Sequence, residues 1–403
     1  MIILALNPID SLTEAPTLKF IGEFVQEIEQ KRPSFQQLFG LDDKQSRIES
    51  ILKEELENNW HKLPEPMNLF TEEYSVDSSS ASRTLSNGVD FFIIRALMLG
   101  TGNYSKPKLR FEMVKGIRDY NVIAGFERIL RDLIEIEIVL DNIDDIPENS
   151  IVLIDGNLYG RFTHLLQELQ LSGWYHLPLE LLDAMQRLFT ECERRNIMLV
   201  GVSKFSKTRV LTTALLRPSF PSLSEPEYLD VELLYRWKHG ETGYTTPLLL
   251  GDYAIAKEIT QLEDNPEKYR ERYFGHISPD RRDWALQVIS DIPYSPAIVM
   301  FHMIPKGDAQ PLRIDIPACS LGLRKKITDI RPFEFIEPEK VADVAQQITS
   351  DFGGRDVYNA LLYIVDREVR LGMKTVDTVY KSVLGKELGV PIEYDRATRR
   401  FSN

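Results

Sequence analysis

The segment Ser150–Leu158, with the sequence Ser-Ile-Val-Leu-Ile-Asp-Gly-Asn-Leu, constrains the fold of this chain more than any other. Four consecutive apolar residues run without a break into Asp155 and Gly156. A short apolar run that ends in turn residues is typical of a strand buried on both faces of a sheet. Asp155 is therefore predicted at the carboxyl end of a central strand, where open α/β sheets bind ligands. A buried carboxylate there needs a compensating cation, such as a divalent metal, although an isolated Asp-Gly pair is more often a simple turn.

The composition excludes several classes of protein. A chain of 403 residues with 43% hydrophobic and 27% charged residues is typical of a globular protein with two or three structural units. No apolar run approaches the roughly 20 residues of a membrane helix, and the amino terminus lacks the pattern of a signal peptide. Two cysteines without pair spacing argue against a disulfide framework and fit a reducing cytoplasm. The net charge of −13 argues against coating nucleic acid with the whole surface but allows a local basic groove.

The order of predicted elements indicates the fold class. Strands are predicted at Glu73–Asp77 and at Val89–Leu99, the second forming a hairpin with Lys108–Val114. A helix at Asp119–Asn142 precedes the Asp155 strand, and helices and a further strand follow. Three strands followed by alternating helices and strands is how an RNase H-like sheet is threaded. We therefore predict an α/β fold of the RNase H-like (PIWI-type) class, a mixed sheet flanked by helices.

The chain is predicted to have four regions. Residues 1–70 form a helical extension that either binds a partner or packs on the core. Residues 71–215 form the first part of the RNase H-like core, and residues 216–290 form an accessory region. Residues 291–403 complete the core and add carboxy-terminal helices, including a long one around Asp356–Leu371.

Several acids could converge on Asp155. If the first strand lies beside the fourth, Asp77 becomes its neighbour, and two adjacent buried aspartates cannot both ionise without a cation between them. In the intervening helix, Glu137 falls in the middle of an apolar face, whereas Glu135 points roughly opposite, toward solvent. Glu137 is therefore the predicted third acid, the alternative being that a slight rotation at the helix end exposes it. That apolar face comprises Phe126, Ile129, Leu130, Leu133 and Leu140.

The last long helix offers two further groups. Tyr358 and Asp366 are eight residues apart, so they can share one side of a helix. The alternatives are a Tyr358 that packs in the core and a solvated Asp366 that pairs with Arg370 four residues later.

Taken in order, these motifs resemble the NurA nuclease family. The resemblance covers about residues 70–380 and rests on the Asp77 strand, the Arg131-x-x-x-x-x-Glu137 helix, the Ile-Asp-Gly-Asn-Leu strand, Gly201-Val-Ser-Lys204 and Arg313-Ile-Asp-Ile-Pro317. It implies a dimeric RNase H-like nuclease that depends on Mn²⁺ or Mg²⁺ and acts on DNA. The family works with the hexameric HerA ATPase in processing DNA ends for recombination and double-strand break repair.

The family's functional residues map onto individual positions. Asp77, Glu137 and Asp155 match its metal-binding acids, and Tyr358 matches its carboxy-terminal tyrosine. Asp366 stands where the family usually has histidine, which puts the last metal ligand in doubt, although aspartate is a competent ligand for either ion. Ser78 stands where the family usually has glycine.

Phosphodiester hydrolysis by two metal ions would use these acids, with Lys204 holding a phosphate or remaining a solvated loop residue. Candidate contacts to the DNA backbone are Lys106-Pro-Lys-Leu-Arg110 with Lys115 and Arg118, and Lys204-Phe-Ser-Lys-Thr-Arg209, in which Phe205 is a possible stacking residue.

The alternatives to a DNA repair nuclease are a scaffold for the ATPase without catalysis, an enzyme acting on RNA or RNA–DNA hybrids, and a nuclease that defends against invading DNA.

Overall fold

The computed structural model describes residues 20–38, 47–116, 119–163, 168–222, 226–252, 275–331, 333–354 and 356–394. The chain divides into two units, residues 1–55 and 56–403, and the larger unit contains the sheet and the candidate site. The four predicted regions stay predictions. Arg118 lies outside the described residues. No described helix has both the length and the apolar character that crossing a membrane requires.

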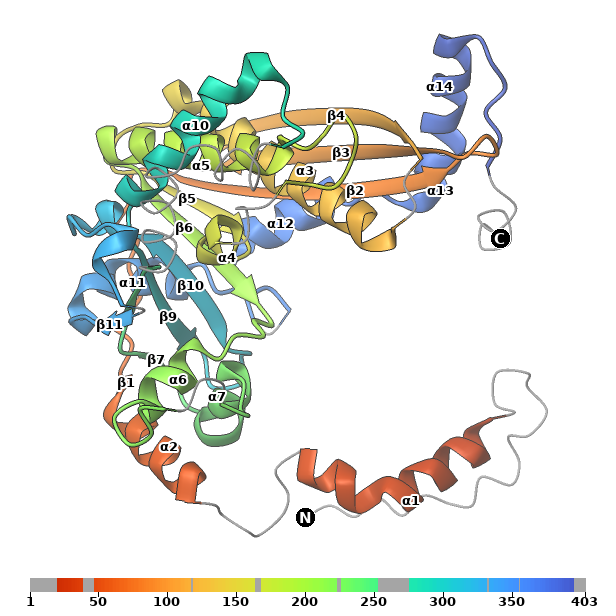
Figure 1. Cartoon of the computed structure of the whole chain (residues 1–403). Helices are drawn as coiled ribbons and strands as arrows, with labels where there is room; N and C mark the ends of the chain where they lie inside the picture. The colour runs from red at the N-terminus through yellow and green to blue at the C-terminus, as the bar shows by residue number, and fades with distance from the viewer. Residues whose placement is uncertain are drawn as a thin grey trace. The chain divides into compact units, whose positions relative to one another are not determined.

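The larger unit is built on one mixed sheet, which is eleven-stranded in the described residues (Figure 1). Its main path runs in the order β1 (Trp60–His61), β7 (Gly243–Thr245), β9 (Ile298–Ile304), β10 (Leu312–Pro317), β6 (Met198–Lys204), β5 (Ile151–Asp155), β2 (Glu73–Thr84), β3 (Val89–Gly100) and β4 (Ser105–Lys115). Two short strands lie off this path: β8 (Leu248–Leu250), which pairs with β9, and β11 (Phe333–Phe335), which pairs with β8.

The strand order confirms the predicted RNase H-like class. β2, β3 and β4 form an antiparallel meander, β5 lies parallel beside β2, and β6 lies parallel beside β5. The predicted end of the first strand is wrong, because β2 does not stop at Asp77. Its pairing with β5 ends at Val76, and the strand then continues beside β3 as far as Thr84. Asp77 thus lies where β2 leaves β5.

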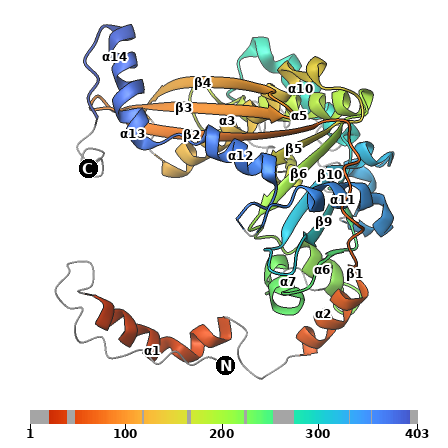
Figure 2. The same cartoon turned by 180° about the vertical axis from the view of Figure 1, so that it is seen from behind.

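Helices cover both faces of the sheet, as Figures 1 and 2 show from opposite sides. The helices α3 (Tyr120–Asp141) and α5 (Leu177–Arg194) share one hydrophobic core with Val152 and Ile154 of β5. Ile151 and Leu153 face the second core, which includes residues of α11 (Ala342–Ser350) and α12 (Ala360–Val369). This alternation explains the unbroken apolar run in β5, since every side chain of the strand before Asp155 is buried.

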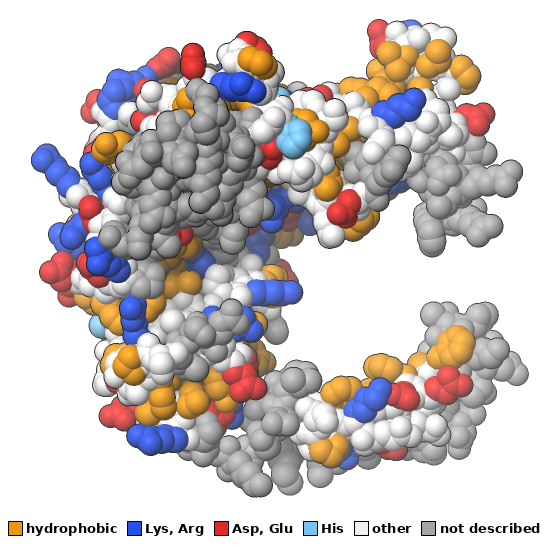
Figure 3. Space-filling view, in the orientation of Figure 1, with side chains coloured by type: hydrophobic (Ala, Val, Ile, Leu, Met, Phe, Trp, Pro, Cys, Tyr) orange, Lys and Arg blue, Asp and Glu red, His pale blue; other side chains and the backbone are white. Residues whose placement is uncertain are grey.

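The remaining helices connect or extend these layers. In the larger unit they are α4 (Leu158–Thr163), α6 (Val210–Leu216), α7 (Asp230–Lys238), α10 (Arg282–Asp291), α13 (Met373–Thr375), a π-helix at Val376–Tyr380 and α14 (Lys381–Leu388). The smaller unit contains α1 (Ile21–Leu38) and most of α2 (Arg47–Asn58). Short 3₁₀ helices lie at Ile143–Asp145, Pro279–Arg281, Ile292–Tyr294, Ala318–Leu321, Ile327–Asp329 and Pro338–Val341. Around α14, the exposed apolar side chains include Val379, Val383, Leu388 and Val390, in the orange patch at the upper right of Figure 3.

Glu73, at the start of β2, predicts a pH dependence of stability. It accepts hydrogen bonds from Gln347 and Asn359, while burial and the nearby Asp351 raise its pKa to about 8. The folded protein therefore binds a proton at Glu73 more tightly than the unfolded chain does. The resulting contribution to the free energy of unfolding is lost as pH rises from about 4.5 to 8. Over that range Tm, measured by calorimetry, is expected to fall less in Glu73→Gln than in wild type. Parallel decreases in the two proteins would contradict this role of Glu73.

Candidate active site

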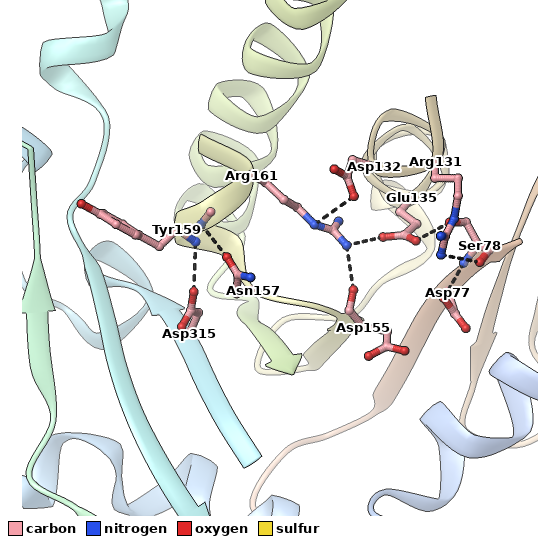
Figure 4. A network of polar contacts seen from close by, with 11 residues as sticks. Asp77, Ser78, Arg131, Asp132, Glu135, Asp155, Asn157, Tyr159, Arg161 and Asp315 are labelled. Atoms are coloured by element: carbon pink, nitrogen blue, oxygen red, sulfur yellow. Dashed lines mark hydrogen bonds and ion pairs between the residues drawn. The ribbon is translucent and has the colours of Figure 1, made fainter. Parts of the chain in front are cut away.

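Asp77 and Asp155 lie at equivalent positions on adjacent parallel strands. Val76 is paired with Ile154, and each aspartate is the next residue along its strand. Asp77 is only 5% exposed, and the Asp155 side chain is 25% exposed. In Figure 4 both carboxylates point into the same space at the centre of the sheet. The predicted pairing of these two acids is therefore what the strand register produces.

The two carboxylates oppose each other's ionisation. Burial raises the pKa of Asp77 to about 7, and the negative charges of Glu135 and Asp155 add to this shift. Burial also raises the pKa of Asp155, against the opposing charges of Lys204 and Arg161. Lys204 Nζ lies 3.5 Å from Asp155 Oδ2. Because like charges are held close together in a partly dry site, a divalent cation between them would be strongly favoured.

Glu135, rather than Glu137, is the acid that α3 directs toward this site. Glu135 is 2% exposed and accepts a hydrogen bond from Ser78, the residue after Asp77. The predicted orientation of the two glutamates is therefore wrong. α3 packs on β2 and β3 with one side and on α5 with another, so almost its whole circumference is apolar between Leu133 and Val139. An apolar stripe that wide does not define which helix face meets the strands.

Glu137 points toward the edge of the sheet instead. Its carboxylate lies 2.9 Å from Lys108 Nζ and 3.9 Å from Arg110 Nη1, both on β4. It lines a separate cavity of about 950 Å³ between α3 and α5, which neither Asp77 nor Asp155 reaches. Ion pairs with Lys108 and Arg110 of β4 therefore account for the orientation of the Glu137 side chain.

Arg161 is a site residue that the sequence analysis did not identify. One of its nitrogens, Nη2, donates to Glu135 Oε2 at 2.6 Å and to the Asp155 carbonyl at 2.7 Å, and its Nε lies 3.4 Å from Asp132 Oδ1 (Figure 4). Gly156 has a φ of +109°, and a side chain there would meet the Arg161 guanidinium at 3.1 Å. The Asp-Gly turn thus makes room for a buried arginine that connects β5 to α3.

Ser78 and Arg131 complete this network. Arg131 donates to the Ser78 hydroxyl at 3.2 Å and to the Ser78 carbonyl at 3.1 Å. Ser78 stands where the NurA family usually has glycine. Its hydroxyl donates a hydrogen bond to Glu135, and its hydroxyl and carbonyl oxygens accept hydrogen bonds from Arg131. The four-residue spacing of Arg131 and Glu135, which puts both on one side of a helix, was the available signal for this pair.

Tyr358 and Asp366 approach the same acids from the opposite face of the sheet. Burial raises the pKa of Tyr358, and the charges of Asp155, Asp77 and Asp366 raise it further. The two residues do not share one helix, because α12 begins after Asn359, whose side chain caps it. Asp366 pairs with Arg370 at 3.1 Å, which was the alternative considered for it. Lys204 Nζ lies 4.0 Å from the centre of the Tyr358 ring.

A cavity of about 530 Å³, lined by four arginines and four acids, opens beside the acid pair. Its lining includes Asp77, Glu135, Asp155 and the arginines Arg128, Arg131, Arg161 and Arg313. Arg313 is bound by Asp315, which also accepts the backbone N–H of Tyr159 at the start of α4. Arg128 and Arg131 are exposed.

The first predicted basic stretch has a different environment. Lys106 pairs with Asp145, Lys108 with Glu137 and Asp141, and Arg110 with Glu112. Since these acids already neutralise the stretch, it offers little net charge to a DNA backbone. In the second stretch, Lys207 and Arg209 are exposed and follow closely in sequence after Lys204, which contacts Asp155.

The acids suit a divalent ion by their chemistry. Carboxylates are hard oxygen ligands, which Mg²⁺ and Mn²⁺ prefer. The raised pKa values of Asp77 and Asp155 show that the surrounding residues do not supply enough positive charge to stabilise both ionised forms. Among the described residues, however, no three Asp, Glu, His or Cys side chains are already grouped around one ion position. Asp77 and Asp155 are therefore the two carboxylates that would hold such an ion.

Comparison with known proteins identifies the fold. The NurA domain model matches residues 73–371. The NurA nuclease from Sulfolobus solfataricus superimposes with a TM-score of 0.60 at 11% identity, over 92% of this chain and 97% of that one. A NurA structure bound to dAMP and manganese gives a TM-score of 0.50 at 11% identity, over 93% and 97% of the two chains. No curated protein matches the chain.

The RNase H-like mixed sheet flanked by helices is thus the fold of the NurA nucleases. Because the NurA domain covers most of its length, the chain belongs to the NurA family.

Proposed function

We propose that this chain is a metal-dependent NurA-type deoxyribonuclease. The observation that carries the proposal is the parallel register that sets Asp77 beside Asp155 at the rim of an arginine-lined cavity. The carboxylates would hold Mn²⁺ or Mg²⁺, and the exposed Arg128 and Arg131 would bind the phosphates of DNA. The structures of NurA with manganese and of NurA with dAMP and manganese support the choice of metal and substrate.

The residues of this chain would divide the work as follows. Two bound divalent ions would supply an activated water and neutralise charge on the scissile phosphate. Asp77 and Asp155 would hold the ions, and Asp366 would approach as a further carboxylate. Glu135, fixed by Ser78 and Arg161, would either complete the ligand set or orient water. Lys204, whose Nζ lies 3.5 Å from Asp155, would bind a phosphate oxygen of the substrate.

The assembly and cellular role are also proposals. Membership of the family supports a cytoplasmic homodimer that processes single-stranded and duplex DNA ends together with a HerA-like hexameric ATPase. The exposed apolar side chains around α14 offer contact area for such an assembly. Double-strand break repair and defence against invading DNA would use the same chemistry.

The proposed activity is tested by incubating the purified protein with end-labelled single-stranded DNA, duplex DNA and RNA of one sequence, with Mn²⁺, Mg²⁺ or EDTA. Cleavage of DNA that requires the metal is expected. Faster cleavage of RNA would favour an enzyme that acts on RNA or RNA–DNA hybrids. An inactive protein that co-elutes with the ATPase would favour a scaffold for the ATPase without catalysis.

The two glutamates of α3 form a matched pair for testing the site. Glu135→Gln is expected to lower the cleavage rate roughly tenfold to a hundredfold, the usual effect of removing a group that supports metal ligands. Glu137→Gln is expected to leave the rate unchanged, because its partners lie on β4. Initial rates at saturating Mn²⁺ check both, with Tm as a control for folding. The reverse ranking would restore Glu137 as the third acid.

A further inference from the structure

Phe205 has an unusual combination of backbone and exposure. It follows Lys204, the last residue of β6, with a φ of +55°, and its side chain is 68% exposed. Left-handed backbone is rare for a bulky residue and costs free energy. An exposed ring recovers little of that cost by packing in the core. A ring kept in solvent by strained backbone, next to Lys204 of the acidic site, points to a ligand.

Phe205 lies at a cavity of about 250 Å³ beside the acids. Phe352, Tyr358 and Tyr363 provide further aromatic lining, and Lys204 and Asp366 provide charged groups. This volume is below the about 300–1,000 Å³ typical of sites for drug-sized ligands, so it suits a single planar ring system. Lys204 contacts both Tyr358 and Asp155, which connects the cavity to the acid pair.

Tyr358 supplies a polar group to this cavity. The residue is 8% exposed, and its buried hydroxyl has no hydrogen-bond partner among the described residues. Buried hydroxyls are nearly always satisfied, because an unsatisfied one loses its bonds to water without replacement. A planar ligand with polar edges would stack on Phe205 and satisfy Tyr358.

We propose that this cavity binds one unpaired nucleobase of a DNA end, with Phe205 as the stacking residue. The inference rests on the proposed nuclease function and narrows its substrate. A base paired in a duplex cannot present its face to Phe205, whereas an unpaired one can. The preferred substrate is thus a single-stranded end or a duplex end with at least one frayed nucleotide.

The test compares binding of three single-stranded oligonucleotides in Ca²⁺: one with all its bases, one abasic at the 5′ end and one abasic at the 3′ end. Wild type is expected to bind one abasic oligonucleotide roughly fivefold to a hundredfold more weakly, which is the range of one lost base stack. Phe205→Asn keeps a residue that accepts left-handed backbone but removes the ring, so it should bind all three alike. Phe205→Trp should restore the difference. Tyr294→Ala removes another 68%-exposed aromatic and should behave as wild type.

Equal affinity of wild type for all three oligonucleotides would overturn the base site, and so would a preference that survives in Phe205→Asn. Cleavage assays on the same oligonucleotides with Mn²⁺ separate the two proposals. Metal-dependent cleavage without any base preference would remove the base site and leave the nuclease. A base preference in binding without cleavage by any of the proteins would remove the nuclease proposal and leave the base site.

Discussion

Asp155→Asn is expected to lower metal-dependent DNA cleavage by roughly a thousandfold, the upper range for removing one electrostatic group from a catalytic site. The change keeps the shape of the side chain and removes its charge. Asp155 ends β5 beside Asp77, and both carboxylates line the same cavity, so the change removes one of the two acids proposed to hold the metal. We expect Mn²⁺ to raise the Tm of wild type by binding to the folded protein. Because Asp155→Asn loses both a ligand oxygen and a negative charge, this rise should be absent in the variant.

The matched control is Asp145→Asn. Asp145 is half-exposed and pairs with Lys106 at 3.0 Å outside the acid pair, so both the rate and the response to Mn²⁺ should be those of wild type. Initial rates over a Mn²⁺ titration and calorimetry with and without the metal check both variants. A folded Asp155→Asn protein that cleaves DNA at the wild-type rate would remove Asp155 from the metal site.

The sheet was predictable because β5 allows one interpretation. Ile151–Ile154 are apolar at four consecutive positions, which is possible only if both faces of the strand are covered. The order of strands and helices then places β2 beside β5, and Asp77 beside Asp155 follows from the parallel register. Each step used a strong local pattern.

The position of the third acid could not be obtained in the same way. On α3, the helical period discriminates faces only when one side is exposed, and here Ile134, Glu135 and Ile136 are all buried. The position of Glu135 is fixed by tertiary partners, Ser78 on β2 and Arg161 on α4. A buried charge is located by its counter-charge, which lies elsewhere in the sequence.

Asp366 shows a second limit of periodic patterns. The prediction put it on one side of a helix with Tyr358, but the helix begins after Asn359. Both residues still lie close enough to Asp155 to interact with its charge, Tyr358 from before α12 and Asp366 from within it. The shared helix was therefore wrong, and a common role for the two residues stays a prediction.

Arg161→Met is expected to lower the free energy of unfolding by about 3–5 kcal/mol, the cost of leaving one partner of a buried ion pair without the other. The Arg161 side chain is 9% exposed and Glu135 is 2% exposed, at 2.6 Å from each other. Methionine replaces the length of the side chain but not its hydrogen bonds to Glu135 and to the Asp155 carbonyl. Urea unfolding of the metal-free protein measures the change.

The pH dependence of this loss identifies its cause. Burial already raises the pKa of Glu135, and removal of Arg161 raises it further, so Glu135 takes up a proton more readily in the variant. The destabilisation should therefore be smaller at pH 5 than at pH 8. Adding Glu135→Gln should recover part of the loss at pH 8, because no buried charge is then left unpaired. Arg187→Met breaks an exposed pair with Asp183 and should change stability by less than about 1 kcal/mol. A loss in Arg161→Met that is the same at both pH values and unaffected by Glu135→Gln would show that Arg161 acts through packing, not by compensating the acid beside Asp77.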